Sequence, residues 1–269
     1  MGYKLTWVYV WATQVRPTLQ SDRPDIDSFT LSTSVASGVS GLHAVWTGWD
    51  YVYLWRNTSN LRQCSATGWD LSNFNSSIIS SLSYQSRWLW CKPDWTKLYN
   101  SFDNGNIYEI TMGTAYSLSW ATVSSNSMWL ACCGIGLSYD GTKLYHWVWD
   151  NNYQKQFIEY TLATPRDVSS RWTWTARTVS AIDWTGHADA PFIYQVAVSP
   201  TGKKMYFSAD QWKIYQYNLS TPYDWNTATY YGVMDTWFGA RCTFQFKDDW
   251  TRIIAWNLSD QKLYQYDAS

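Results

Sequence analysis

The sequence has few charged residues. They make up 15% of the 269 residues, against roughly 25% in ordinary soluble domains. Twenty basic and 21 acidic residues give a formal net charge of −1, so the charge balance favours neither a polyanion nor an anionic membrane as partner. We therefore expect no nucleic-acid binding.

Long apolar segments are also missing. The longest stretch without a charge, residues 110–139, is interrupted by many Ser and Thr residues, which makes it a poor membrane-spanning helix. Near the N-terminus the apolar patch Trp7–Trp11 is short and is soon followed by polar residues and Arg16, unlike a secretory signal. We expect no membrane insertion.

Metal-binding, disulfide and catalytic patterns are absent. The five cysteines are odd in number and lack C-x-x-C spacing, and the histidines at 43, 146 and 187 have no second His or Cys at ligand spacing. The cysteines are therefore interpreted as small apolar core residues. Neither G-x-S-x-G, H-E-x-x-H nor a P-loop occurs. We expect no metal, no cofactor and no enzymatic activity.

An internal repeat is the main feature that the sequence does have. A tight turn followed by an aromatic strand recurs five times, and a second strand follows each copy at nearly constant distance. The third turn residue gives steps of 46, 46, 61 and 48 residues, at Trp49, Trp95, Gly141, Gly202 and Trp250. An apolar strand with period-two spacing precedes each turn, and a segment rich in Ser and Thr ends each unit.

Four antiparallel strands in about 47 residues form one blade of a β-propeller. The repeat thus predicts an all-β, five-bladed β-propeller of four-stranded antiparallel blades. The fifth unit ends at Ser269 without a fourth strand, and alignment of the units places residues 25–32 in that position. We expect this N-terminal strand to pair antiparallel with residues 263–267 and close the ring, which removes the open edge.

Two domains follow from this alignment. Residues 1–23 form an N-terminal arm, and residues 24–269 form the propeller. The arm is either a strand lying against the propeller or an attachment arm. Within the blades, a recurrent Gln/Glu column in the third strands is interpreted as their polar face, and Lys97, Lys143 and Arg252 at the turns are expected to be solvated.

Residues 199–232, SPTGKKMYFSADQWKIYQYNLSTPYDWNTATYYG, resemble a propeller repeat of bacterial and phage-encoded proteins. The segment VYVWATQVRP (8–17) is similar to one that begins some phage virion proteins, VY-x-G-x-x-x-VRP, from which it departs at Trp11. The resemblance implies the propeller fold and a phage virion, tail or extracellular surface setting, with other virion proteins as partners. It implies no catalytic residues.

The 21 tryptophans are unusual in their positions. Trp49, Trp95 and Trp250 occupy the turn column that holds glycine in the other two copies. Such turns often need a positive φ, which glycine adopts freely. One hypothesis is UGA recoding, in which the source translates UGA as glycine; the alternative is a set of true surface tryptophans, for example a ring that stacks on sugars.

One step of the repeat is longer than the others by about 14 residues. The excess lies in residues 149–156 and 181–192, two connections on the same face of a four-stranded blade. Because binding residues are concentrated on loops carried by rigid scaffolds, this face is the candidate ligand-binding site; the alternative is a neutral surface insertion. The nominated residues are Asp150, Tyr153, Trp184, His187 and Asp189.

Three functions are compatible with these features. The first is a non-catalytic phage virion or tail-associated propeller that contacts a protein or glycan surface ligand or a virion partner. The second is a multivalent carbohydrate-binding lectin, against which stands the lack of one polar and aromatic pocket repeated in all blades. The third is an enzyme with its site at the channel mouth, for which the sequence offers no acid/base or metal cluster.

Overall fold

The computed structural model describes residues 29–36, 42–47, 51–56, 60–66, 70–83, 88–92, 96–102, 105–127, 132–149, 155–178, 193–209, 213–236, 242–247, 251–257 and 260–268. Twenty strands in these ranges form five four-stranded sheets with antiparallel pairing throughout. The ranges contain no helix long and apolar enough to cross a membrane.

Each sheet is one blade, numbered here in chain order. Blade 1 comprises β2 (Leu42–Thr47), β3 (Tyr51–Arg56), β4 (Asn60–Ser65) and β5 (Asn75–Ser83). Blade 2 comprises β6 (Trp88–Cys91), β7 (Lys97–Phe102), β8 (Asn106–Thr111) and β9 (Thr122–Ser127). Blade 3 comprises β10 (Cys132–Leu137), β11 (Lys143–Trp149), β12 (Lys155–Leu162) and β13 (Arg171–Thr178).

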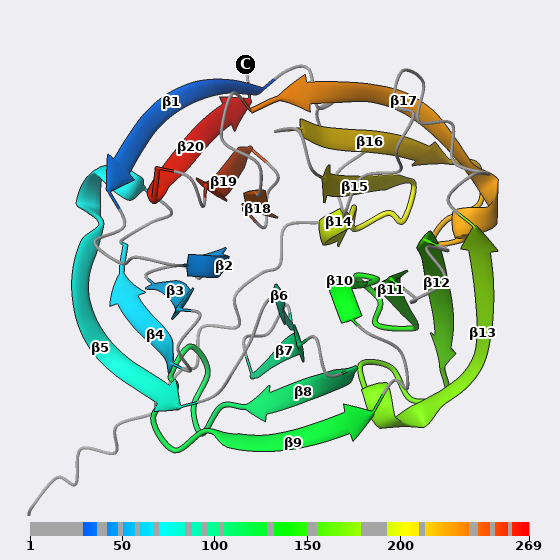
Figure 1. The fold of residues 1–269 in the computed structure, drawn as a ribbon, viewed down its shortest axis with the longest axis horizontal. Coiled ribbons are helices and arrows are strands. Elements are labelled where there is room, and N and C mark those ends of the chain that lie inside the picture. Colours follow the sequence, from blue (N-terminus) through cyan, green and yellow to red (C-terminus); the bar gives the residue numbers. More distant parts are fainter. Residues whose placement is uncertain are drawn as a thin grey trace, which may run out of the picture.

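Blade 4 comprises β14 (Ile193–Val198), β15 (Lys204–Ala209), β16 (Lys213–Leu219) and β17 (Ala228–Asp235). Blade 5 comprises β18 (Cys242–Phe246), β19 (Arg252–Asn257), β20 (Lys262–Ala268) and, from the other end of the chain, β1 (Phe29–Ala36). The sheets stand around a common axis, and the strands at the rim are β5, β9, β13, β17 and β1 (Figure 1). The predicted all-β propeller of four-stranded blades is confirmed.

The ring closes by the predicted exchange of an N-terminal strand. β1 pairs antiparallel with β20, from Phe29 opposite Ala268 to Ala36 opposite Lys262. The partner and direction were predicted correctly, but the predicted bounds of 25–32 are wrong by four residues. The alignment of the units set Asp25 opposite Asn226, which lies in the short 3₁₀ helix Trp225–Thr227 before the outer strand of blade 4, so the predicted strand began too early. The arm, residues 1–23, lies outside the described residues.

Aromatic side chains fill the space between blades. Trp225 of blade 4 is buried against Phe157 of blade 3 and Phe207 of its own blade, with ring centroids 4.8 and 5.1 Å apart. An aromatic side chain of this size removes roughly 150–250 Å² from water, which corresponds to about 4–6 kcal/mol before entropy is counted. These contacts therefore hold neighbouring blades together.

The innermost strands approach one another closely. A Cβ atom on Gly136 of β10 would lie 2.7 Å from the carbonyl oxygen of Val196 in β14, so only glycine permits this approach. Across the axis, the buried Gln195 of blade 4 donates its side-chain amide to the carbonyl of Leu89 in blade 2, at 3.1 Å. Side chains and backbone thus meet at this level of the axis.

Candidate functional site

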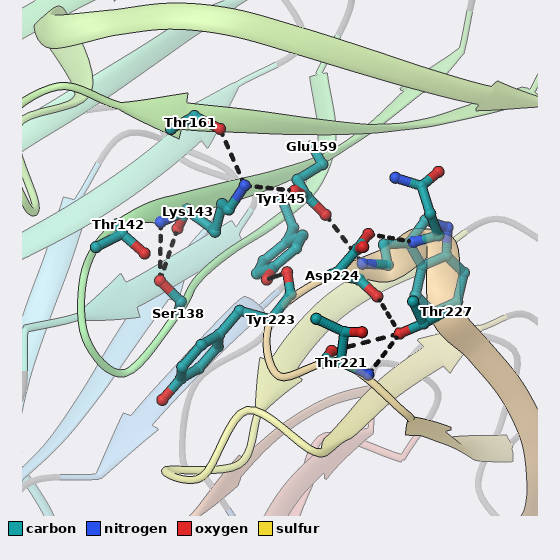
Figure 2. A network of polar contacts seen from close by, with 12 residues as sticks. Ser138, Thr142, Lys143, Tyr145, Glu159, Thr161, Thr221, Tyr223, Asp224 and Thr227 are labelled. Atoms are coloured by element: carbon teal, nitrogen blue, oxygen red, sulfur yellow. Dashed lines mark hydrogen bonds and ion pairs between the residues drawn. The ribbon is translucent and has the colours of Figure 1, made fainter.

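A tyrosine in the second strand of three blades bonds to the following blade. The Tyr145 hydroxyl donates to the carbonyl oxygen of Tyr223 at 2.6 Å (Figure 2). Tyr53 donates in the same way to Tyr116, and Tyr99 donates to Arg166. Burial raises the pKa of all three phenols above the ordinary value, so they remain neutral donors.

The carbonyl acceptors belong to residues with left-handed backbones. Tyr116, Arg166 and Tyr223 have φ of 65°, 63° and 62°, a conformation that costs a non-glycine residue about 1–3 kcal/mol. Each lies in the short connection that leads to the outer strand. Two positions later in each connection comes a buried residue: Leu118, Val168 or Trp225. The hydroxyl bond and the packing of that connection help to offset the strain.

The recurrent Gln/Glu column of the third strands accepts backbone N–H groups from the next blade. Gln63 accepts from Leu118 at 3.1 Å, Glu159 from Trp225 at 3.0 Å, and Gln265 from Leu71 at 3.2 Å. These three side chains are buried. The interpretation of the column as a merely polar strand face is therefore incomplete, because its members at these positions are inter-blade acceptors. We call these bonds and the tyrosine bonds the junction contacts.

The turn cations, which were expected to be solvated, are partly exposed but form ion pairs. Lys143 Nζ lies 2.8 Å from one carboxylate oxygen of Glu159 and donates to Thr161 at 3.0 Å (Figure 2). Lys97 pairs likewise with Glu109, and Arg252 lies 2.8 Å from Asp267. In blades 2 and 3 a lysine on the second strand thus accompanies a glutamate on the third.

Short 3₁₀ helices carry two of these N–H donors, those of Leu71 and Trp225. η3 (Leu71–Asn73), η4 (Val168–Ser170) and η6 (Trp225–Thr227) each follow an aspartate whose side chain accepts an N–H from the helix at 2.9 Å. Aspartate favours this capping position because its oxygen satisfies an N–H that the helix leaves unbonded. For Asp70, this bond from the Ser72 N–H lowers the carboxyl pKa.

The two glycines of the turn column are required by geometry. Gly141 and Gly202 have φ of +78° and +73°, and a Cβ at these positions would lie 2.3 Å from Arg166 and 2.7 Å from the Tyr223 ring. The aligned Trp49, Trp95 and Trp250 lie outside the described residues. Elsewhere, Trp120 has φ of 62° and an exposed fraction of 92%.

The described histidine, His146, is a core residue. Its side chain is fully buried on β11, and neither ring nitrogen has a hydrogen-bond partner in the part of the chain that the structure describes. Burial, aided by Arg171, lowers its pKa to about 3, so the ring is neutral at pH 7. Within the described ranges no group of three or more His, Cys, Asp or Glu side chains is placed to hold a metal ion.

The nominated site residues Asp150, Tyr153, Trp184, His187 and Asp189 lie outside the described residues. The strand ends that carry their loops are described. Trp149 pairs with Lys155, and the next residue, Gln156, pairs with Thr178. Residues 150–154 and 179–192 therefore both start from the same end of the blade 3 strands. We call this side of the ring the insertion face.

The junction contacts lie toward the other face of the ring. There the first-to-second-strand turn of blade 3 bonds to the connection that precedes its outer strand, since Arg166 N–H donates to Gly141 O at 2.8 Å. This face, formed by residues 138–142 and 162–170 in blade 3 and their counterparts, is called the turn face. Some of the polar side chains there bind one another, as Ser138 and Thr142 both donate to Asp140.

No protein-family model and no curated protein matches the sequence. Solved structures are similar to the chain, and two of them serve as examples. One is the β-propeller domain of Cps50 (Swd1) from Myceliophteria thermophila, with 8% identity over 85% of this chain and a TM-score of 0.45. The other is a putative 6-phosphogluconolactonase from Bacteroides uniformis, with 14% identity over 83% of this chain and a TM-score of 0.47. This chain spans 65% of the length of each, and neither likeness bears on activity.

Proposed function

We propose that this protein is a non-catalytic binding propeller, associated with a phage virion or tail, that contacts a surface ligand or a neighbouring virion protein through the insertion face. The observation that carries the proposal is the division between the two faces. The turn face is occupied by junction contacts that bind blade to blade, such as Tyr145–Tyr223 and Glu159–Trp225. The longest connection, residues 179–192, and the longest second-to-third-strand turn, residues 150–154, leave from the opposite end of the blade 3 strands.

The chemistry of the described polar groups supports binding as the function. The groups with strongly shifted pKa values include the buried tyrosines of the junction contacts and the neutral His146. Such perturbed groups are candidates for catalysis when they line a cleft, but the tyrosines here donate to backbone carbonyls of the next blade. A fold of this kind is suited to carry loops for partner recognition.

The virion setting rests on the resemblance of residues 8–17 and 199–232 to phage and bacterial sequences. A glycan is a candidate for the surface ligand. The exposed Trp120 could stack on a sugar, yet its counterparts in the other described blades, Asn73, Ser170 and Thr227, are not aromatic. A lectin with equivalent sites in every blade is therefore the second candidate only.

A loop exchange tests the proposal. Residues 182–190 are replaced by a short Gly/Ser linker, and the variant and the unaltered chain are assayed on an array of bacterial surface glycans and on purified tail proteins encoded beside the gene. We expect binding to be lost while the far-UV circular dichroism and melting temperature persist, since surface loops contribute little to stability. Unchanged binding by the variant would overturn the assignment of the insertion face.

A single substitution at the turn face is the control. Gly141→Ala forces a Cβ against Arg166 and into a left-handed backbone, so it should lower the melting temperature. At temperatures where this variant is folded, its binding should equal that of the unaltered chain.

A further inference from the structure

Within the described residues, the rim of blade 5 ends in a strand edge that has little of the usual protection. β1 is the last strand of its sheet, and its sequence FTLSTSVA contains no charged residue and no proline. Natural sheets generally protect such edges with charges, proline, a β-bulge or a covering segment, because the exposed backbone groups can pair with another strand. Of these devices, β1 has only a register shift between Leu31 and Thr33 in the part of the chain that the structure describes. The outer strands of blades 3 and 4 contain charges, including Arg171 and Asp235, whereas β5 and β9 contain none. β1 differs from β5 and β9 in that the N-terminal segment of the chain leads directly into it.

The side chains of β1 are consistent with a covered edge. Leu31 has an exposed fraction of 55%, and Thr30 and Ser34 are also exposed. An exposed leucine between polar neighbours on an outermost strand leaves apolar area in water that a paired strand would bury.

The chain itself contains a segment suited to this edge. Nine of the thirteen residues at positions 3–15, YKLTWVYVWATQV, are Val, Thr, Tyr or Trp, the types that favour strands. The only charge among them is Lys4. These residues precede β1 in the chain, so the segment leaves the ring at the rim, at Phe29.

The connection between this segment and β1 favours pairing with another molecule. Hairpins that pair neighbouring strands of one chain usually have loops of two to five residues. Here thirteen residues, 16–28, intervene and include Pro17 and Pro24. Fully extended, they span about 43 Å, enough to reach a second copy whose rim faces the first.

We propose that residues 3–15 of one copy add as a strand to the outer edge of β1 in a second copy, and that the exchange is reciprocal. Each β1 then receives the arm of its partner, which gives a closed two-fold dimer. Main-chain hydrogen bonds supply the affinity, as in other cases of strand addition. The inference depends on the proposed structural role but not on the insertion face.

Mass and cross-linking measurements on the full chain test the proposal. Sedimentation velocity between 1 and 100 µM should show a dimer for the full chain and a monomer after deletion of residues 1–20. In an equal mixture of isotopically light and heavy copies, an amine cross-linker should join Lys4 of one isotope to Lys262 of the other, because antiparallel addition places Lys4 at the Ala36 end of β1, which pairs with Lys262.

Two substitutions make the test specific for the edge. Leu31→Lys places a charge on the edge and should weaken the dimer at least tenfold. Tyr231→Lys alters an equally apolar residue, exposed by 43% on the outer strand of blade 4, and should leave the dimer unchanged. Both variants should keep the far-UV spectrum of the full chain.

A monomeric full chain at 100 µM, a dimer that survives deletion of 1–20, or cross-links confined to one isotope would overturn the proposal. The last result would show that the arm pairs within its own chain. Loss of ligand binding in the 182–190 exchange is independent of all three results, so failure of this inference and failure of the proposed function are distinguishable.

Discussion

At the scale of single residues, several side chains hold conformations or environments that their chemistry disfavours. Trp120 lies at the third position of a turn closed by a bond from Ala121 N–H to Leu118 O, at 3.2 Å, and its φ is 62°. Glycine is the residue that such a turn favours. Together with the turn glycines 141 and 202, this is the geometry that UGA recoding would explain, and sequencing of the coding DNA at codons 49, 95, 120 and 250 tests it.

Trp120→Gly should stabilise the protein by about 1 kcal/mol. The substitution removes about 1–3 kcal/mol of backbone strain. Against this, glycine increases the entropy of the unfolded chain, which costs about 0.5–1 kcal/mol of stability. Removal of the exposed ring sacrifices almost no buried area. Urea denaturation measures the difference. Ser119→Gly, at the neighbouring exposed turn position, is the control and should not raise the midpoint; a lower midpoint for Trp120→Gly would contradict the prediction.

The buried His146 should make the protein sensitive to acid. Its pKa is about 3 when folded and near 6.5 in the unfolded chain, so the unfolded state binds a proton that the folded state does not. Stability is therefore unaffected above pH 6.5 and falls as the pH decreases from 6.5 towards 3, by up to roughly 1.4 kcal/mol for each unit.

His146→Leu should reduce this loss. Blade 1 has a buried leucine, Leu54, at the aligned position, which indicates that the fold tolerates the substitution. Chemical denaturation at pH 7, 6, 5 and 4 compares the two proteins. Equal slopes of stability against pH would show that His146 does not control the acid response.

At the scale of strands and connections, substitutions of Glu159 test whether its junction contact with Trp225 requires a hydrogen-bond acceptor or a negative charge. Glu159→Gln keeps an oxygen for the Trp225 N–H, as Gln63 and Gln265 do in other blades, and should change stability little. Glu159→Leu leaves that buried N–H without its acceptor and should cost about 1–3 kcal/mol. Guanidinium denaturation compares the variants, and an equal loss for both would assign the effect to the ion pair with Lys143.

The strands could be predicted from sequence because the period-two pattern and the 46-residue step depend on local spacing. The junction contacts could not, since they join residues 50 to 200 positions apart, such as Gln63 with Leu118 and Gln265 with Leu71. A signal for the tyrosine bonds was present in the sequence. Tyr99 and Tyr145 each follow a turn lysine by two positions, and Tyr53 recurs at the same place in blade 1. A polar hydroxyl repeated on a buried strand needs a partner, which this spacing alone does not identify.

At the scale of the whole molecule, the ring depends on one strand from the opposite end of the chain. Deletion of residues 1–20 removes no strand of the ring, so at concentrations where the full chain is monomeric it should leave the melting temperature of the propeller nearly unchanged. Deletion of 1–36 removes β1 and all its pairs with β20, exposes the edge of β20, and should lower the melting temperature by more than about 10 °C. Differential scanning calorimetry distinguishes the two, and equal temperatures would contradict closure by β1.

The antiparallel pairing of β1 with β20 also determines how the ring would bear a mechanical load. A pull on the N-terminal arm enters the ring at Phe29, and Phe29 lies opposite Ala268 at one end of the paired segment. Traction along the strand from that end shears every bond of the β1–β20 ladder together, whereas traction across the strand opens the bonds one after another. A chain tethered by its arm would thus resist force applied along β1 far better than force directed outward from the rim.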